Sequence, residues 1–253
     1  MALWSAAQNL PVDLPEHRFL DFFEQTVQIF AFFLCADPPD TGFIKSNSFE
    51  DQKMNLLVVK SSVFAGGGQS SMLAEKFVQN WRDQYPDAEV AERDLSAHPV
   101  PHLDASRIGA LFSAPDGRTV EQQAVLDYAD ELLAEVTSAD AIVLAVPMYN
   151  FGVPSQLKAW LDHLARAGVS FKYTETGPVG LLQDKPVYIL AARGGVYHAA
   201  GQDYQAPFLR QFFGLLGITS LEFVYAEGLN MGEDAKQQAL AEAEQQIASL
   251  IVA

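Results

Sequence analysis

Residues 141–154 read AIVLAVPMYNFGVP, and they set the architecture of the chain. The first six form an unbroken apolar run, which is typical of a strand covered on both faces in a parallel sheet. Pro154 suits the first turn of a helix. An apolar stripe at helical spacing follows and consists of Leu157, Trp160, Leu161 and Leu164. The segment therefore predicts a central strand, a turn at its carboxyl end and a helix that packs against the sheet.

The same pattern of strands extends in both directions from this segment. Apolar runs at residues 56–59 and 187–192 predict two more central strands, and residues 221–226 predict a fifth strand. Residues 90–95 carry three charged side chains in succession, so this strand is expected nearer an edge of the sheet.

Helices are predicted between these strands from apolar residues that recur every three or four positions. Thr119 and Gln122 form a capping-box pattern at the start of one helix. The expected core-facing stripes are Leu73, Phe77, Trp81 and Tyr85; Val125, Tyr128, Leu132 and Val136; and Leu240, Ala243, Ile247 and Leu250. Strand and helix alternate about five times, which implies an α/β fold with an open parallel sheet, either flavodoxin-like or Rossmann.

Composition and charge narrow the possible partners. The chain has 253 residues, 49% of them hydrophobic and 19% charged, as in globular proteins. Its net charge of −16 would repel nucleic acid and anionic membranes. Cys35 is the single cysteine, so an internal disulfide is impossible, and no zinc-type Cys/His spacing occurs. A reducing cytoplasm fits this composition.

Residues 1–53 differ from the rest and are expected to be an extension outside the domain at 54–253. Their apolar stretch at 19–34 contains Asp21 and Glu24 and follows no basic region, which suits neither a spanning helix nor a signal peptide. Met54 directly opens the first predicted strand. Two interpretations stay open: the native chain begins at Met54, or the extension is a real but loosely attached arm.

Three loops follow strands predicted to be central, and in doubly wound sheets ligands bind at these carboxyl ends. The loop at 60–71 lacks both the GxGxxG spacing and the P-loop ending. Its three glycines, the hydroxyls of Ser62 and Ser70 and the start of a helix would suit the phosphate of a mononucleotide. The alternative is a flexible glycine turn in which Ser70 is a plain N-cap.

The other two loops would suit a flat ring. In the loop at 147–154, Tyr149 and Phe151 flank Asn150 and could bind a heteroaromatic ring, unless the prolines merely shape a turn and both rings are core. In the loop at 193–198, Arg193 or nearby amides could stabilise negative charge on a reduced ring. The alternative there is a glycine turn with Arg193 in an ion pair.

Residues 54–253 resemble the FMN-dependent NADH-azoreductases, a family of flavodoxin-like quinone reductases. The resemblance is carried by KSS at 60–62, GQS at 68–70, PMYNF at 147–151, ARAGV at 165–169 and RGG at 193–195. It implies a flavodoxin-like, doubly wound, five-stranded parallel sheet of order 2-1-3-4-5 with helices on both faces. It also implies tightly bound FMN, NADH as co-substrate and a homodimer with FMN at the interface.

The resemblance assigns site residues position by position. The FMN phosphate would be held by Ser62, Gly68, Gln69 and Ser70. The isoalloxazine would be lined by Met148, Tyr149, Asn150 and Phe151, and its polar edge closed by Ala192, Arg193, Gly194 and Gly195. Phe171 and Tyr173 of the partner subunit would add an aromatic wall for the substrate. Many members of this family have a hydroxyl residue where this chain has Ala192, so the resemblance does not extend to the side-chain hydrogen bond that this hydroxyl would make to the flavin.

The expected function is the transfer of two electrons from NADH to quinones and azo compounds, with ping-pong kinetics. The flavin N5 carries this chemistry, so no catalytic side chain and no metal are expected. Of the five histidines, only His198 lies beside a predicted loop and could donate a proton. One rival is a non-enzymatic FMN-binding electron carrier, which would need a separate reductase. Another is a structural α/β domain, which would purify colourless.

Overall fold

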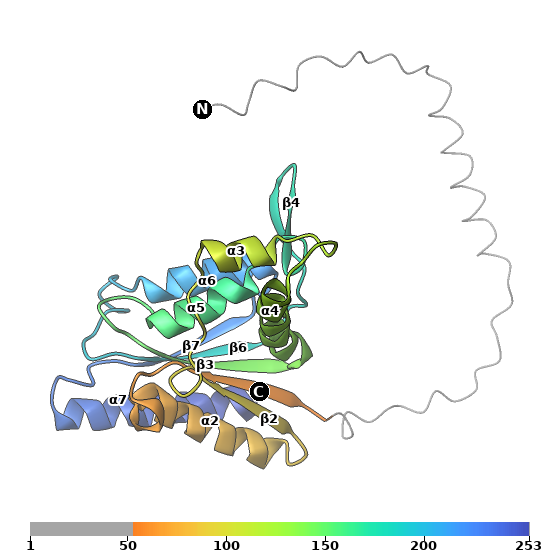
Figure 1. Ribbon diagram of the computed structural model, residues 1–253. Coiled ribbons are helices and arrows are strands. Elements are labelled where there is room, and N and C mark those ends of the chain that lie inside the picture. Colours follow the sequence, from red (N-terminus) through yellow and green to blue (C-terminus); the bar gives the residue numbers. More distant parts are fainter. Residues whose placement is uncertain (1–52, 253) are drawn as a thin grey trace, which may run out of the picture. The chain divides into compact units, whose positions relative to one another are not determined.

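The computed structural model describes residues 53–252 (Figure 1). The predictions for the N-terminal extension, apart from Lys53, and for Cys35 lie outside the described residues. Among residues 53–252, no helix combines the length and the apolar character that crossing a bilayer requires. Nor does this part of the chain hold a cluster of three or more side chains suited to a metal ion.

Five parallel strands form the main sheet in the order β2-β1-β3-β6-β7. Counted along the chain, this is the predicted order 2-1-3-4-5, and the strand expected nearer an edge is the edge strand β2. The bounds are β1 (Asn55–Lys60), β2 (Glu89–Asp94), β3 (Ala141–Pro147), β6 (Val187–Ala192) and β7 (Leu221–Ala226). Every residue of β3 is buried, as its unbroken apolar run predicts.

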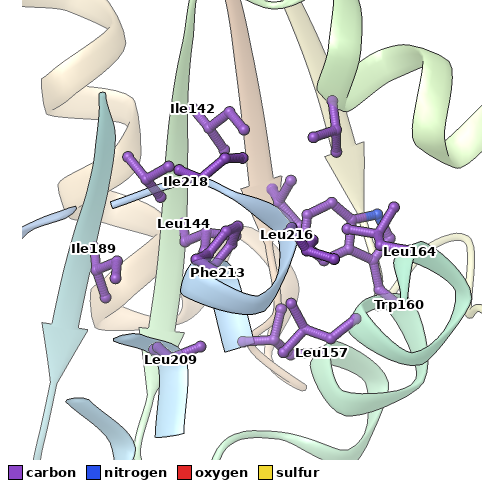
Figure 2. Close-up of a cluster of buried hydrophobic side chains, with 14 of the residues drawn as sticks. Ile142, Leu144, Leu157, Trp160, Leu164, Ile189, Leu209, Phe213, Leu216 and Ile218 are labelled. Atoms are coloured by element: carbon purple, nitrogen blue, oxygen red, sulfur yellow. The ribbon is translucent and has the colours of Figure 1, made fainter. Parts of the chain in front are cut away.

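Helices cover both faces of the sheet (Figure 1). One face packs against α2 (Gln69–Gln84) and α7 (Glu233–Val252). The other packs against α4 (Val120–Ser138), α5 (Ser155–Leu164) and α6 (Gln205–Leu216), with the short α3 (Ala105–Leu111) beside α4. Each central strand serves both cores because its side chains alternate: Leu56 and Val58 of β1 join one cluster, and Leu57 and Val59 join the other. Figure 2 shows the larger cluster around Leu144, Trp160 and Phe213.

The helix predictions hold with small shifts. Thr119 and Gln122 form the expected capping box at the start of α4. The buried face of α4 is rotated from the predicted stripe, since Val125 and Tyr128 are only partly buried. Its buried residues are Leu126, Ala129, Leu132, Leu133 and Val136. Pro154 is the N-cap of α5 and precedes its first turn.

Sequence patterns did not predict α3, α6 or a hairpin outside the main sheet. The hairpin pairs β4 (Phe171–Thr174) with β5 (Gly177–Gly180) and projects from the body of the domain (Figure 1). Its base packs against the C-terminus of α6, where a Cβ on Gly180 would lie 2.0 Å from the backbone nitrogen of Gly217. Only glycine permits this approach, so Gly180 fixes where the hairpin leaves the domain.

Candidate functional site

A pocket of about 180 Å³ lies at the carboxyl end of the sheet. Its lining comes from the carboxyl ends of β3 and β6, from the loops after β1, β3, β6 and β7, and from the first residue of α2. The lining residues are Ser62, Phe64, Gly68, Gln69, Pro147, Met148, Tyr149, Ala192, Arg193, Gly194, Leu229 and Asn230. The three loops singled out in the sequence therefore meet in one place, and a fourth loop joins them.

Hydroxyl groups tie the loop after β1 to the loop after β3. Ser62 Oγ and the hydroxyl of Tyr149 share a hydrogen bond of 3.2 Å, and the same tyrosine oxygen accepts one from the Val63 amide at 3.3 Å. Ser62 Oγ also accepts a bond from the Phe64 amide at 3.2 Å. Ser61 Oγ donates to the carbonyl of Ala145 at 2.7 Å. These contacts fix the loop although residues 61–71 contain no basic side chain.

The start of α2 leaves polar groups without protein partners. Its N-cap is Gly68, so the alternative of Ser70 as the N-cap is wrong. No side chain caps this end and its first turn has no acidic residue, so the first amides of the helix remain free to bind an anion. Gln69 Oε1 and the buried Ser70 Oγ also have no hydrogen-bond partner within the described residues.

Gly68 is required by the close packing of this loop. A Cβ at this position would lie 2.1 Å from Ser62 Oγ. Neighbouring Gly67 has no atom within 4 Å of the corresponding point. The two adjacent glycines thus differ: one makes room for Ser62, and the other lies in open space.

The loop after β3 turns sharply at Asn150 and Phe151, which have φ angles of 49° and 67°. Such left-handed conformations are costly for residues other than glycine. The turn is closed by reciprocal hydrogen bonds between Tyr149 and Gly152 at 3.1 and 3.0 Å. Gln205 Nε2 of α6 supports it by donating to the carbonyls of Pro147 at 3.1 Å and Gly152 at 2.9 Å.

This turn separates the four predicted ring-lining residues. Met148 and Tyr149 line the pocket, whereas Asn150 and Phe151 do not. Phe151 is 60% exposed, so the alternative that both rings of this loop are core is wrong for it. It lines a neighbouring cavity of about 530 Å³ together with Tyr204 and Phe208.

The loop after β6 is shaped by a buried ion-pair network. The guanidinium of Arg193 is fully buried and contacts Asp203 at 2.8 Å and Glu227 at 3.0 Å. It also lies over the ring of Tyr225, 4.9 Å from the centroid. The same oxygen of Glu227 accepts bonds from the amides of Tyr197 at 3.0 Å and His198 at 2.9 Å. The ion-pair interpretation of Arg193 is therefore correct, and its charge is already neutralised by carboxylates.

The network shifts the pKa values of its members. Burial acts to raise the pKa of Asp203, but hydrogen bonds from Arg193 and from the amides of Ala206 and Gln205 outweigh it, so the pKa lies below its ordinary value. Burial, together with the charge of Asp203, raises the pKa of Tyr225 to about 12. At neutral pH Asp203 is therefore a carboxylate and Tyr225 a neutral phenol.

The loop after β7 was missed in the sequence. Its backbone pairs with the loop after β6: Leu229 donates to the carbonyl of Arg193 at 3.1 Å, and Asn230 donates to that of Gly194 at 2.9 Å. The rule that selected the other loops applies here too, because residues 227–231 follow a strand at the same end of the sheet. Phe64 also lines the pocket without having been selected, although it lies within the predicted loop.

The remaining predicted residues lie apart from the lining. Ser70 is buried behind it in the first turn of α2, and Gly195 lies one residue beyond it. Phe171 is buried in the hydrophobic core of its own chain, whereas Tyr173 on the hairpin is 75% exposed. His198 stacks on Tyr225 with ring centroids 4.1 Å apart and is not among the lining residues.

The family model described as "Flavodoxin-like fold" matches residues 54–251. The chain is 57% identical over 198 residues to the FMN-dependent NADH:quinone oxidoreductase of Cellvibrio japonicus (strain Ueda107), with 78% of this chain and 98% of the relative covered. It is 53% identical over 194 residues to the protein of the same name from Alcanivorax borkumensis, with 77% and 98% covered.

Solved structures give a consistent result. The crystal structure of azoreductase AzrA has a TM-score of 0.72 at 32% identity, covering 78% of this chain and 98% of its own. An FMN-dependent NADH-azoreductase from Bacillus anthracis, solved in complex with FMN, has a TM-score of 0.69 at 27% identity, covering 79% and 100%.

Proposed function

The chain belongs to the family with the flavodoxin-like fold, and from this membership we propose that it is an FMN-dependent oxidoreductase that transfers two electrons from NADH to quinones. The observation that carries the proposal is the pocket at the carboxyl ends of four strands, beside the uncapped start of α2. The same activity is named for the relatives from Cellvibrio japonicus and Alcanivorax borkumensis.

The residues at the start of α2 suit a phosphate group. The free amides of the first helical turn and the positive end of the helix dipole both favour an anion. The carboxamide of Gln69 lines the pocket, while the unpaired Ser70 Oγ lies in the same first turn. We assign the FMN phosphate to Ser62, Gly68, Gln69 and Ser70.

The other walls of the pocket suit the ring. Met148 and Tyr149 offer an apolar and an aromatic surface, and Ala192, Arg193 and Gly194 also line the pocket. The two segments adjoin, because the Met148 amide donates to the carbonyl of Ala192 at 3.0 Å. Backbone amides can hydrogen-bond a flat heterocycle along its edge. Ala192 contributes no hydroxyl there. We place the isoalloxazine between these walls, with Asn150, Phe151 and Gly195 at its outer border.

When bound, FMN accepts a hydride from NADH and passes two electrons onward. The protein holds the ring and leaves one face open to substrates. Because Arg193 is already paired with Asp203 and Glu227, backbone amides of this loop would be the groups that stabilise negative charge on a bound flavin. His198 has no assigned step, because it is not among the lining residues.

NADH and the acceptor use this one site in turn, which gives ping-pong kinetics. This is supported by the sequence, which has no GxGxxG fingerprint for a separate dinucleotide site. Azo compounds are a second class of acceptor, as the names of the structural neighbours suggest. Cleavage of an azo bond to two amines takes up four electrons and four protons, so each bond consumes two NADH. The single cysteine suits a cytoplasmic enzyme.

A visible spectrum tests the proposal directly. The purified protein should show flavin absorbance, NADH added under nitrogen should bleach it, and menadione should restore it. Steady-state data at several menadione concentrations should give parallel double-reciprocal lines. An electron carrier would keep its colour with NADH alone. A protein that stays colourless and does not quench FMN fluorescence would overturn the assignment.

We further propose that the enzyme is a homodimer with Tyr173 of each subunit near the partner's FMN. The projecting hairpin carries Tyr173 into solvent, and isolated two-stranded hairpins are marginally stable in water. Two neighbouring cavities share Phe208, one lined by Phe151 and Tyr204 and the other by Phe212 and Leu215. Light scattering should give the mass of two chains, and Tyr173→Ala should raise the KM for menadione. A fully active monomer would contradict the dimer.

A further inference from the structure

The loop after β7 brings one side chain into the pocket with its polar groups free. Asn230 lines the pocket and is exposed to solvent. Within residues 53–252 its carboxamide makes no hydrogen bond, and only its backbone amide is used, in the 2.9 Å bond to the carbonyl of Gly194. In Gln205, by contrast, Nε2 already donates to the carbonyls of Pro147 and Gly152, and only Oε1 has no partner within the described residues.

Gly194 leaves room for this side chain. A Cβ on Gly194 would lie 2.5 Å from Nδ2 of Asn230 and 3.1 Å from its Cγ. The carboxamide therefore packs directly on the backbone of the loop after β6, at the wall where the polar edge of a ring would end. The absence of a side chain at Gly194 is what lets the carboxamide approach so closely.

We propose that Asn230 is a further flavin-binding residue whose carboxamide hydrogen-bonds the pyrimidine ring of FMN, an inference that rests on the proposed function. The pyrimidine edge of a flavin alternates carbonyl and nitrogen groups, some accepting and one donating hydrogen bonds. A carboxamide offers both an acceptor and two donors and can match such an edge. The neighbouring Leu229 and the main chain of Gly194 provide no side-chain donor.

The test measures ligand binding and redox potential, with unfolding temperature as the check on folding. Asn230→Ala should raise the dissociation constants of FMN and of riboflavin by a similar factor of about 5–30, since riboflavin shares the ring and lacks the phosphate. Asn230→Asp keeps the shape but places a negative charge by the ring. It should lower the midpoint potential of bound FMN, with the reduced form weakened at least about tenfold relative to the oxidised form. Asn80→Ala, on α2 and outside the pocket lining, is the matched control and should leave all three measurements unchanged.

The possible results distinguish a failure of this inference from a failure of the proposed function. If the wild-type protein fails to bind FMN, the proposed function is overturned and the role of Asn230 with it. If the wild-type protein binds FMN and Asn230→Ala binds both flavins within twofold of it, only the role of Asn230 is overturned. A loss confined to FMN, with riboflavin binding intact, also overturns it, because the contact would then be to the phosphate end.

Discussion

Two loops border the same pocket, one between β1 and α2 and the other between β6 and α6. They differ in how far their polar groups are already paired with other protein groups. In the first, Gln69 Oε1, Ser70 Oγ and the opening amides of α2 have no partner among the described residues. In the second, two carboxylates bind the guanidinium of Arg193, and Glu227 also binds two backbone amides.

This difference suggests that the first loop binds a ligand and that the second fixes the shape of the pocket. A buried polar group without a partner costs about 1–3 kcal/mol, so a cluster of them is sustained where a ligand supplies the missing bonds. In the Arg193 network the charges are paired, and this holds the backbone in one conformation, although the buried Nε of Arg193 has no hydrogen-bond partner among the described residues. The loop of Arg193 thus presents its main chain at a fixed position, and the loop of Ser70 presents free donors and acceptors.

The largest effect is expected when the loop between β6 and α6 loses the cation that pairs with its two carboxylates. Arg193→Ala would leave Asp203 and Glu227 buried without their partner, which should lower the free energy of unfolding by about 3–5 kcal/mol. Urea denaturation of the apoprotein measures this. Arg210→Ala is the matched control, since Arg210 also lies over a ring of β7, 4.6 Å from the centroid of Phe223, but is exposed. Its cost should stay below about 1 kcal/mol. Equal losses in both variants would mean that the buried ion pairs add nothing.

The next effect tests the shape of the phosphate loop. Gly68→Ala would drive a Cβ to 2.1 Å from Ser62 Oγ, so the loop must move. The dissociation constant of FMN, measured by fluorescence quenching, should rise about tenfold or more, because overpacking of this kind costs about 1–3 kcal/mol. Gly67→Ala meets no atom within 4 Å and should bind FMN as the wild type does. Similar affinities for both variants would show that the loop tolerates the added carbon and is not the phosphate cradle.

A smaller effect distinguishes an unpaired hydroxyl from a paired one. Ser70 and Ser170 are both fully buried, but only Ser170 is hydrogen-bonded, for example by accepting from the Arg166 amide at 2.8 Å. Ser70→Ala removes an unpaired buried hydroxyl, so it should leave the apoprotein at least as stable as the wild type, and it should weaken FMN binding by about threefold to tenfold. Ser170→Ala should destabilise the apoprotein by about 1–2 kcal/mol and leave the affinity for FMN unchanged. The opposite pattern would reverse the assignment of the two serines.

The sequence located both loops but did not predict which of their polar groups are paired. Local patterns predicted all five strands, and the resemblance supplied their order, because buried parallel strands need unbroken apolar runs such as residues 141–146. The same patterns located three loops of the pocket, since a parallel sheet brings its carboxyl ends together. The same rule applies to the fourth loop, which contains Leu229 and Asn230. It was not selected because it has neither a glycine pair nor an aromatic cluster.

The state of each polar group could not be predicted from local patterns. Arg193 and Glu227 lie 34 residues apart, and nothing near either one indicates that they pair. The left-handed turn that moves Asn150 and Phe151 out of the lining depends on Gln205 in α6, a helix that the sequence patterns missed. Long-range hydrogen bonds therefore decide which members of a recognisable motif face the ligand.

The smallest effect concerns a carboxylate at the opposite end of the sheet, where hydrogen bonds are as numerous as in the Arg193 loop but water is close. Asp184 accepts bonds from the amides and hydroxyls of Thr219 and Ser220, and these lower its pKa from 3.8 to about 2. A lowered pKa stabilises the fold above the ordinary value, and this stabilisation is lost as the pH falls from 3.8 toward 2. Because Asp184 is exposed, solvent screening should keep its contribution below about 1 kcal/mol. Urea midpoints of the wild type and of Asp184→Asn should therefore differ slightly at pH 6 and converge by about pH 2. A loss at pH 6 as large as that of Arg193→Ala would mean that the number of hydrogen bonds, and not burial, sets the strength of such carboxylate sites.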